Sequence, residues 1–148
     1  MNEDNAVLDN LMSSLMDKSE TNIYQLLPKG YIVLNLRGKI LGYNSKCREL
    51  LGLMDSEGGI KNMKDFLIGK NKKKFEVMLE FVELKGKIDD FELEITKPKG
   101  QIKIIWISAS AIYDSNKDAI AVHCLMSDMT KEQMFLKQMK KELYAFCD

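Results

Sequence analysis

The sequence predicts an α+β protein: a five-stranded antiparallel sheet with helices on one face and an amphipathic helix at either end. Two short β-like runs meet at a glycine turn near residue 38, and three longer runs with strand-like alternation follow residue 88. The segment between these groups, and both ends of the chain, carry apolar residues at helical spacing. Short turns join successive strands, which favours antiparallel pairing.

The N-terminal segment, residues 1–23, is predicted to form an amphipathic helix. Its apolar residues fall on one stripe, and polar residues such as Asp9 and Ser13 lie opposite. The stripe consists of Val7, Leu8, Leu11, Met12, Leu15 and Met16. We expect this helix to cover the sheet or to mediate dimerisation. Pro28 and Gly30 then separate it from the next element.

The opening hairpin and the helix after it are predicted from turn and cap residues. Residues 31–36 and 39–44 are β-like runs joined at Arg37 and Gly38, a tight turn. The stretch "SKCRELLG" follows, with Ser45 as the expected N-cap of a short helix and Gly52 at its end.

Two more helical segments complete the middle of the chain. Residues 62–68 are expected to form a short helical turn. Residues 71–85 form a firmer helix, with Asn71 as the expected cap and Gly86 as the stop. Its core stripe is Phe75, Met78, Leu79 and Val82.

The last three strands form a meander. "DDFELEITK" alternates strictly, "QIKIIWISASAIY" is a longer strand, and "AIAVHCLM" is the last one. In the long strand Ile105 and Ile107 share one face, whereas Ile104 and Trp106 share the other. A sheet with one wet face does not need both to be apolar, so the N-terminal helix or a second copy of the chain is expected to cover the second face.

Composition bounds the function. Lys plus Arg and Asp plus Glu are 22 each, so no overall field attracts nucleic acid or an acidic membrane. No apolar run is long enough to span a bilayer, and the acidic N-terminus lacks the features of a signal peptide, so a cytoplasmic location is expected. Cys47, Cys124 and Cys147 have no repeated spacing, and His123 is the single histidine, so neither a disulfide framework nor a metal site is expected.

The order of these elements resembles a PAS domain, over a core of residues 24–128. "LPKGYIVLNLRGKILGYNSKCRELLGL" resembles the opening hairpin and helix of that family, and "FELEITKPKGQIKIIWISASAIYDSNKDAIAVHCLMSDMT" resembles its closing meander. The second stretch ends in the Asp-x-Thr signature, here Asp128 and Thr130. The resemblance implies the strand order of the family and a cupped ligand cavity between sheet and helices.

The cofactors of PAS domains are disfavoured here. The flavin photoreceptors carry a reactive Cys in an Asn-Cys-Arg-Phe-Leu-Gln motif, whereas Cys47 follows the opening hairpin directly and lacks the Phe and Gln. Haem-binding members use a His on the helix equivalent to residues 71–85, which contains none. We therefore expect no haem and no flavin, and only a small apolar ligand of unknown identity is compatible with the predicted cavity.

The residues predicted to face that cavity are large and apolar. Two interpretations stay open: a ligand pocket, or a dry packed core. The residues are Phe75, Met78, Leu79, Phe91, Leu93, Ile105 and Ile107. No nucleophile, phosphate-binding loop or acid/base pair stands out, so the chain is not predicted to be an enzyme. The lysines between 61 and 74 lack interleaved aromatic residues, which favours a solvated face over nucleic-acid binding.

The C-terminal segment, residues 129–148, is predicted to be a signalling helix. Thr130 and Gln133 fit a capping box, and Asp128 adds a carboxylate beside the helix start. The apolar seam is Met129, Leu136, Met139, Leu143 and Phe146. It spans about two heptads, so a coiled coil and a helix packed back on its own sheet are both open.

The predicted function is a sensory and dimerisation module of a cytoplasmic signal-transduction protein, of the kind found in two-component systems and transcription regulation. Ligand or partner occupancy would pass through Asp128 and Thr130 into the C-terminal helix. A homodimer and a downstream effector domain or partner protein are expected. The candidate interface residues are Leu8, Leu11, Leu15, Trp106, Leu136, Met139 and Leu143. The alternative is a ligand-free scaffold or dimerisation domain.

Overall fold

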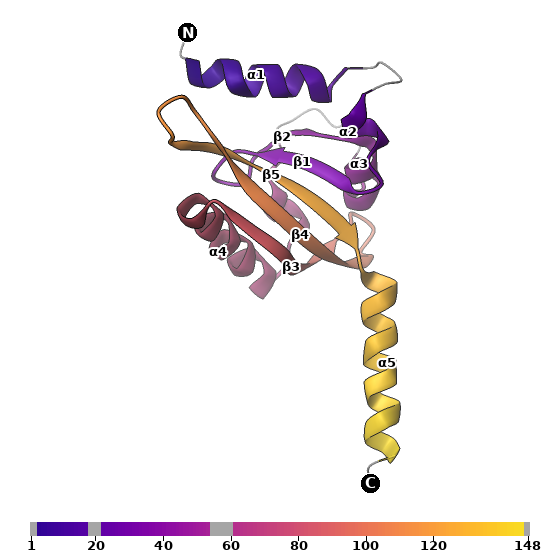
Figure 1. Cartoon of the computed structure of the whole chain (residues 1–148). Helices are drawn as coiled ribbons and strands as arrows, with labels where there is room; N and C mark the ends of the chain where they lie inside the picture. Colours follow the sequence, from indigo (N-terminus) through magenta and orange to yellow (C-terminus); the bar gives the residue numbers. More distant parts are fainter. Residues whose placement is uncertain (1–2, 18–21, 54–60, 147–148) are drawn as a thin grey trace.

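The computed structural model describes residues 3–17, 22–53 and 61–146. Figure 1 shows a central sheet with one helix above it and one helix projecting below. The elements are α1 (Glu3–Leu15), α2 (Ile23–Leu26), β1 (Gly30–Leu34), β2 (Ile40–Tyr43), α3 (Ser45–Leu51), the 3₁₀ helix η1 (Met63–Phe66), α4 (Lys70–Lys85), β3 (Lys87–Thr96), β4 (Ile102–Tyr113), β5 (Ala119–Asp128) and α5 (Thr130–Phe146).

The five strands form one antiparallel sheet in the order β2-β1-β5-β4-β3. The last strand, β5, lies between the first and the fourth, so it bonds to both halves of the sheet. Gly30 of β1 pairs with Met126 of β5, and Ile105 of β4 pairs with Asp128. The predicted α+β fold with a five-stranded antiparallel sheet is confirmed.

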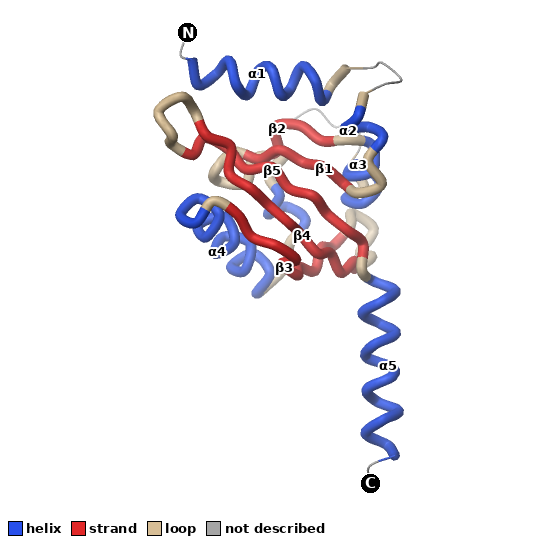
Figure 2. Tube along the Cα trace, viewed as in Figure 1, coloured by secondary structure: helices blue, strands red, loops and turns tan. Residues whose placement is uncertain are grey.

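The main core lies between one face of the sheet and helices α3, η1 and α4 (Figure 2). Alternation along β3 and β4 points Leu93, Ile95, Ile105 and Ile107 at these helices, and all four side chains are buried. Phe75 of α4 is fully buried against the same face. Met78, Leu79 and Val82 are buried in the same core, so the stripe predicted for the helix at residues 71–85 faces the sheet.

The other face of the sheet is covered in part by α1. Leu15 is completely buried there in a second cluster with Tyr31, Val33 and Ala121, and half-buried Leu8 and Leu11 pack against it. This cover lies over β2, β1 and β5 and does not include Ile104 or Trp106. Ile104 is buried beside the start of α5, and Trp106 donates from Nε1 to Oε1 of Glu92 at 3.1 Å.

Two of the predicted helix caps are wrong. Asn44, not Ser45, caps α3: its side-chain oxygen accepts from the backbone N–H of Cys47 at 2.9 Å. Gly69, not Asn71, stands at the start of α4, and its φ of 60° is one that glycine adopts easily. Asn71 lies inside the first turn, where its Oδ1 accepts from the backbone N–H of Glu94 and ties α4 to β3.

The C-terminal helix α5 extends away from the sheet (Figure 1). Leu136, Met139 and Leu143 are 48%, 42% and 60% exposed. The alternative in which this helix packs back on its own sheet is therefore wrong for the described residues. No helix in the described ranges is both long and apolar enough to cross a membrane.

Candidate functional site

The strand-to-helix junction is built around Asp128, the last residue of β5. Its Oδ1 accepts from the backbone N–H of Thr130 at 3.0 Å and from the Thr130 hydroxyl. The Thr130 hydroxyl oxygen in turn accepts from the backbone N–H of Ile104 at 3.0 Å. These bonds link the end of β5, the first residue of α5 and the neighbouring strand β4.

Two more contacts complete the junction. The backbone N–H of Met129 donates to the carbonyl of Ile104 at 2.8 Å, and Nζ of Lys103 lies 3.4 Å from Oδ2 of Asp128. The predicted Thr130–Gln133 capping box is wrong, because the Thr130 hydroxyl is turned to β4. Gln133 N–H bonds to the Met129 carbonyl, and the Asp128 carboxylate supplies the acceptor at the helix start.

The charge of Asp128 is set by opposing effects. Partial burial on its own would raise the pKa of this carboxyl group, because it disfavours the charged form. The hydrogen bonds from the Thr130 hydroxyl and N–H, together with the charge of Lys103, outweigh that effect and lower the pKa below its ordinary value. Asp128 is therefore ionised at neutral pH and holds both oxygens as acceptors.

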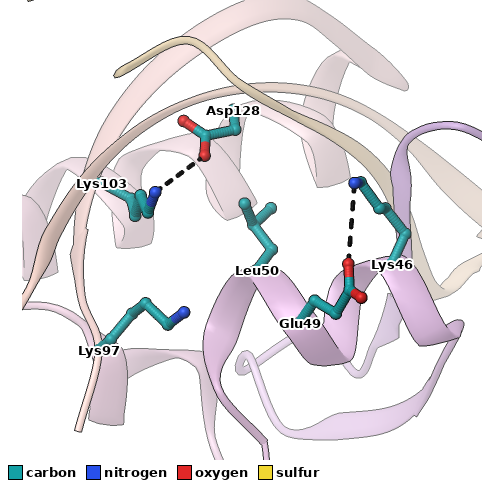
Figure 3. A pocket seen from close by; sticks show the side chains of 6 residues that line it. All are labelled: Lys46, Glu49, Leu50, Lys97, Lys103 and Asp128. Atoms are coloured by element: carbon teal, nitrogen blue, oxygen red, sulfur yellow. Dashed lines mark ion pairs between the residues drawn. The ribbon is translucent and has the colours of Figure 1, made fainter. Parts of the chain in front are cut away.

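A cavity of about 200 Å³ opens beside this junction (Figure 3). Lys97 lies in the β3–β4 connection and Lys103 in β4, whereas Lys46, Glu49 and Leu50 come from α3. The sixth lining residue is Asp128 itself. Lys46 and Glu49 form an ion pair of 3.7 Å across one turn of α3.

The predicted ligand-pocket residues lie together in the main core. Phe75, Met78, Leu79, Leu93, Ile105 and Ile107 are all buried, and Phe91 is half-buried at their edge, with Lys74 Nζ 5.6 Å from its ring centroid. None of the seven lines the cavity beside Asp128. Their role in binding a ligand stays a prediction.

A second cavity, of about 380 Å³, lies on the sheet face beyond α1 and includes Tyr31, Asp89, Ser110 and His123. The Tyr31 hydroxyl and Nδ1 of His123 are 2.8 Å apart. Burial raises the pKa of Tyr31 above its ordinary value and lowers the pKa of His123. Tyr31 therefore stays protonated and can donate to Nδ1 of a neutral His123.

Cys47 and Cys124 are buried thiols with packing roles. Burial raises the pKa of Cys47 above its ordinary range and that of Cys124 to about 12. Both are protonated at neutral pH, which removes the thiolate that nucleophilic or metal-binding chemistry needs. In the described ranges, no group of three His, Cys, Asp or Glu side chains is arranged to hold a metal ion.

The lysines at the start of α4 lie on the surface. Lys70, Lys72 and Lys73 are exposed, and Lys64 pairs with Glu76 at 3.0 Å. The cluster beside Asp128 is a different set of lysines that the sequence did not reveal. Lys46, Lys97 and Lys103 are far apart along the chain, and only the folding of β4 against β5 and α3 brings them together.

The strand order and the helices that cover one face of the sheet define the class of domain, an α+β domain built on a single five-stranded antiparallel sheet. The chain belongs to the PAS domain family: the family model for the PAS domain matches residues 28–131. PAS domains are generally sensory, non-enzymatic signalling modules. No curated protein sequence matches the chain.

Solved structures with this fold come from several organisms. The PAS domain of a protein from Colwellia psychrerythraea is 17% identical, with a TM-score of 0.65 over 85% of this chain and 98% of that one. The PAS domain of an HTR-like protein from Haloarcula marismortui is 14% identical, with a TM-score of 0.59 over 84% and 93%. The Rhodobacter sphaeroides LOV protein is 8% identical, with a TM-score of 0.64 over 85% and 69%. At these identities the likeness shows the shared fold.

Proposed function

We propose that this PAS domain is a sensory and dimerisation module of a cytoplasmic signal-transduction protein. It acts by binding rather than by catalysis. Ligand or partner occupancy biases the sheet between two arrangements, and Asp128 and Thr130 pass that bias to α5. α5 then acts on a downstream effector domain or partner protein.

The observation that carries this proposal is the junction network. Thr130, the first residue of α5, bonds at once to Asp128 of β5 and, through its hydroxyl oxygen, to Ile104 of β4. A shift between β4 and β5 must therefore change the support of the first turn of α5. Beyond that turn, α5 extends away from the sheet, so its direction depends on these few bonds.

The exposed seam of α5 supports dimerisation. Leu136, Met139 and Leu143 recur at helical spacing and remain exposed in the single chain. A second copy of α5 would bury this stripe as in a short coiled coil. The N-terminal helix and Trp106 are the other interface candidates.

The interface can be tested by light scattering on a Leu136→Asp, Leu143→Asp double variant. We expect the wild type to be a dimer and the variant a monomer, because each substitution places a charge in the buried seam. Gln138→Asp with Lys141→Asp is the matched control, since these residues lie off the seam on the same helix. A monomeric wild type, or a double variant that dimerises as well as the control, would contradict dimerisation through the seam of α5.

The proposed transmission from the sheet to α5 through Asp128 and Thr130, called the relay below, can be tested by a double-mutant cycle. Ile105 is buried and pairs with Asp128 in the sheet, so Ile105→Val perturbs the core next to the junction. We expect Ile105→Val to change the dimer dissociation constant in the wild-type background and to have little effect in Asp128→Ala. Glu132→Ala is the control background, because it removes an acid from the first turn of α5 without touching the junction. Equal effects in all backgrounds would contradict the relay.

A second candidate is a scaffold domain that dimerises without a ligand. The close packing of Phe75, Met78 and their neighbours favours it. The absorption spectrum and native mass of the purified protein, followed by melting shifts across a metabolite panel, separate the two. A native mass above that of the polypeptide, or a melting temperature that a metabolite raises, supports the sensor. A native mass equal to that of the polypeptide and an unchanged melting temperature support the scaffold.

A further inference from the structure

The cavity beside Asp128 carries an excess of positive charge. Of the residues that the structure describes, three lysines and two carboxylates line it, and the apolar residue of this set, Leu50, lies between the two sides (Figure 3). Glu49 and Asp128 each pair with one lysine. Among the described residues, no ion pair involves Lys97, whose ammonium points toward the middle of the cavity.

The side-chain stem of Lys97 passes close to Gly52. Gly52, which ends α3, has a φ of 71°, and a Cβ at that position would come within 3.3 Å of Cε of Lys97. The glycine thus ends the helix and leaves room for the lysine stem beside it. The Lys97 ammonium lies at the cavity without an ion-pair partner among the described residues.

The two existing ion pairs leave their lysines available. Lys46 and Glu49 are 3.7 Å apart with side chains 52% and 76% exposed, and Lys103 and Asp128 are 3.4 Å apart at 23% and 35%. Strong charge-assisted bonds are shorter, at about 2.7–2.9 Å, and exposed pairs contribute little stability. Both lysines can turn to a better acceptor at small cost.

The size of the cavity limits what enters it. Typical pockets for drug-sized ligands exceed about 300 Å³, so 200 Å³ suits a compact molecule. A ligand with two negative charges can pair with Lys97 and at the same time replace Asp128 as the partner of Lys103, which a singly charged ligand cannot do. The short apolar surface of Leu50 tolerates a brief hydrocarbon segment.

We propose that this cavity binds a small dianionic oxyanion, a dicarboxylate or a phosphate, through Lys97 with Lys46 and Lys103. Binding draws Lys103 away from Oδ2 of Asp128, while Oδ1 stays bonded to Thr130. The dianion thereby alters the support of α5. This coupling rests on the proposed relay, whereas the binding itself does not.

Binding is tested by calorimetry and by amide NMR shifts with succinate, inorganic phosphate and acetate, at constant ionic strength set with chloride. We expect saturable binding of succinate, phosphate or both, and weaker binding of acetate. Lys97→Gln should weaken binding about tenfold, the loss expected for one hydrogen bond to a charged group. Lys99→Gln is the matched control and should bind as the wild type does.

The titrations with succinate and with phosphate show which chemical class of dianion the cavity binds. Binding of succinate alone assigns a carboxylate ligand, and binding of phosphate alone assigns a phosphate ligand. No saturable binding of either, acetate binding as tight as that of the dianions, or equal losses in Lys97→Gln and Lys99→Gln would overturn the site. Asp128→Asn should tighten binding several-fold, because it removes the competitor for Lys103, and unchanged binding would refute the competition.

Hydrogen exchange at Thr130–Gln133 separates this inference from the proposed function. With a dianion bound, we expect faster exchange at the first turn of α5 in the wild type and no change in Lys97→Gln. Binding without any change at α5 would overturn the coupling and leave the site standing. Absence of binding would overturn the site, while the relay would still be judged by its own double-mutant cycle.

Discussion

Asparagine side chains join the helices to the rest of the domain. Asn44 is almost fully buried, and its oxygen accepts from the backbone N–H groups of Tyr31 and Cys47. Its amide donates to the carbonyls of Tyr24 and Lys29. One side chain thus satisfies four backbone groups, from α2, the α2–β1 connection, β1 and α3, which would otherwise lack these partners.

Replacing Asn44 should therefore cost far more than replacing its neighbour. We expect Asn44→Ala to lower the free energy of unfolding by roughly 3 kcal/mol or more, because it leaves several buried backbone groups unpaired. Ser45→Ala should cost less than about 1 kcal/mol, since Ser45 is exposed and its hydroxyl bonds to the side chain of Gln25 at the surface. Urea unfolding measures both. Equal losses in the two variants would contradict the larger role given to Asn44.

His123 should make stability depend on pH in a defined window. Burial lowers its pKa in the folded state, so between that pKa and about 6.5 the unfolded chain binds a proton that the folded chain does not. The contribution of neutral His123 to the free energy of unfolding is therefore fully present above about pH 6.5 and is lost as the pH drops through this window. The Tyr31 hydroxyl contacts the ring, and Asp89, Ser108 and Ser110 line the same cavity as His123.

The test is urea unfolding between pH 5 and 7.5 for the wild type and His123→Gln. His123 is the only histidine, so no other imidazole contributes to the slope. We expect the decline of stability from pH 7 to pH 5.5 to be smaller in the variant. An identical decline would mean that carboxyl groups, and not His123, cause it.

At the scale of elements, α1 belongs to the folded domain through a few side chains. Leu15 is completely buried at its C-terminal end, and Asn22 fastens the following turn by donating to the Leu15 carbonyl at 3.0 Å. The helix also lies close to Gly42 of β2, where a Cβ would come within 2.9 Å of a Leu15 methyl group. The absence of a side chain at Gly42 allows this close approach.

Leu15→Ala should detach or loosen α1. We expect a loss of about 2–3 kcal/mol in the free energy of unfolding, from lost burial and the cavity left behind. Met16→Ala is the control, because Met16 is exposed and should change stability by less than about 0.5 kcal/mol. Faster hydrogen exchange in β2 and β1 should accompany the loss in Leu15→Ala alone. A loss below 1 kcal/mol would contradict a structural role for α1.

Elements with a clear period could be predicted from the sequence, whereas contacts between distant residues could not. The alternation of Phe91, Leu93 and Ile95 predicted β3, and the helical stripe around Phe75 predicted α4. Asn44 and Ser45 are adjacent and both are good caps, so local preference could not choose between them. The lysines beside Asp128 come from three segments, and no sequence pattern joins them.

At the scale of the whole molecule, α5 contributes little to the stability of the rest. Its seam is exposed beyond the first turn, so removing it deletes few buried contacts. We expect a chain ending at Gln133 to keep the unfolding free energy of the domain within about 1 kcal/mol at low protein concentration. At high concentration, the full chain should become more stable than the truncated one, because dimerisation then adds to folding. No concentration dependence would speak against a dimer through α5.

The pairing of Gly30 with Met126 has a mechanical consequence. The start of β1 and the end of β5 lie side by side, although α1 and α5 depart from opposite ends of the body in Figure 1. Tension applied between the two chain ends would first strip α1 and then pull the neighbouring strands apart from one end. Their hydrogen bonds would open one after another, as in a zipper, instead of breaking together under shear. A domain loaded in this way yields to a weaker pull than one whose strands are loaded in shear.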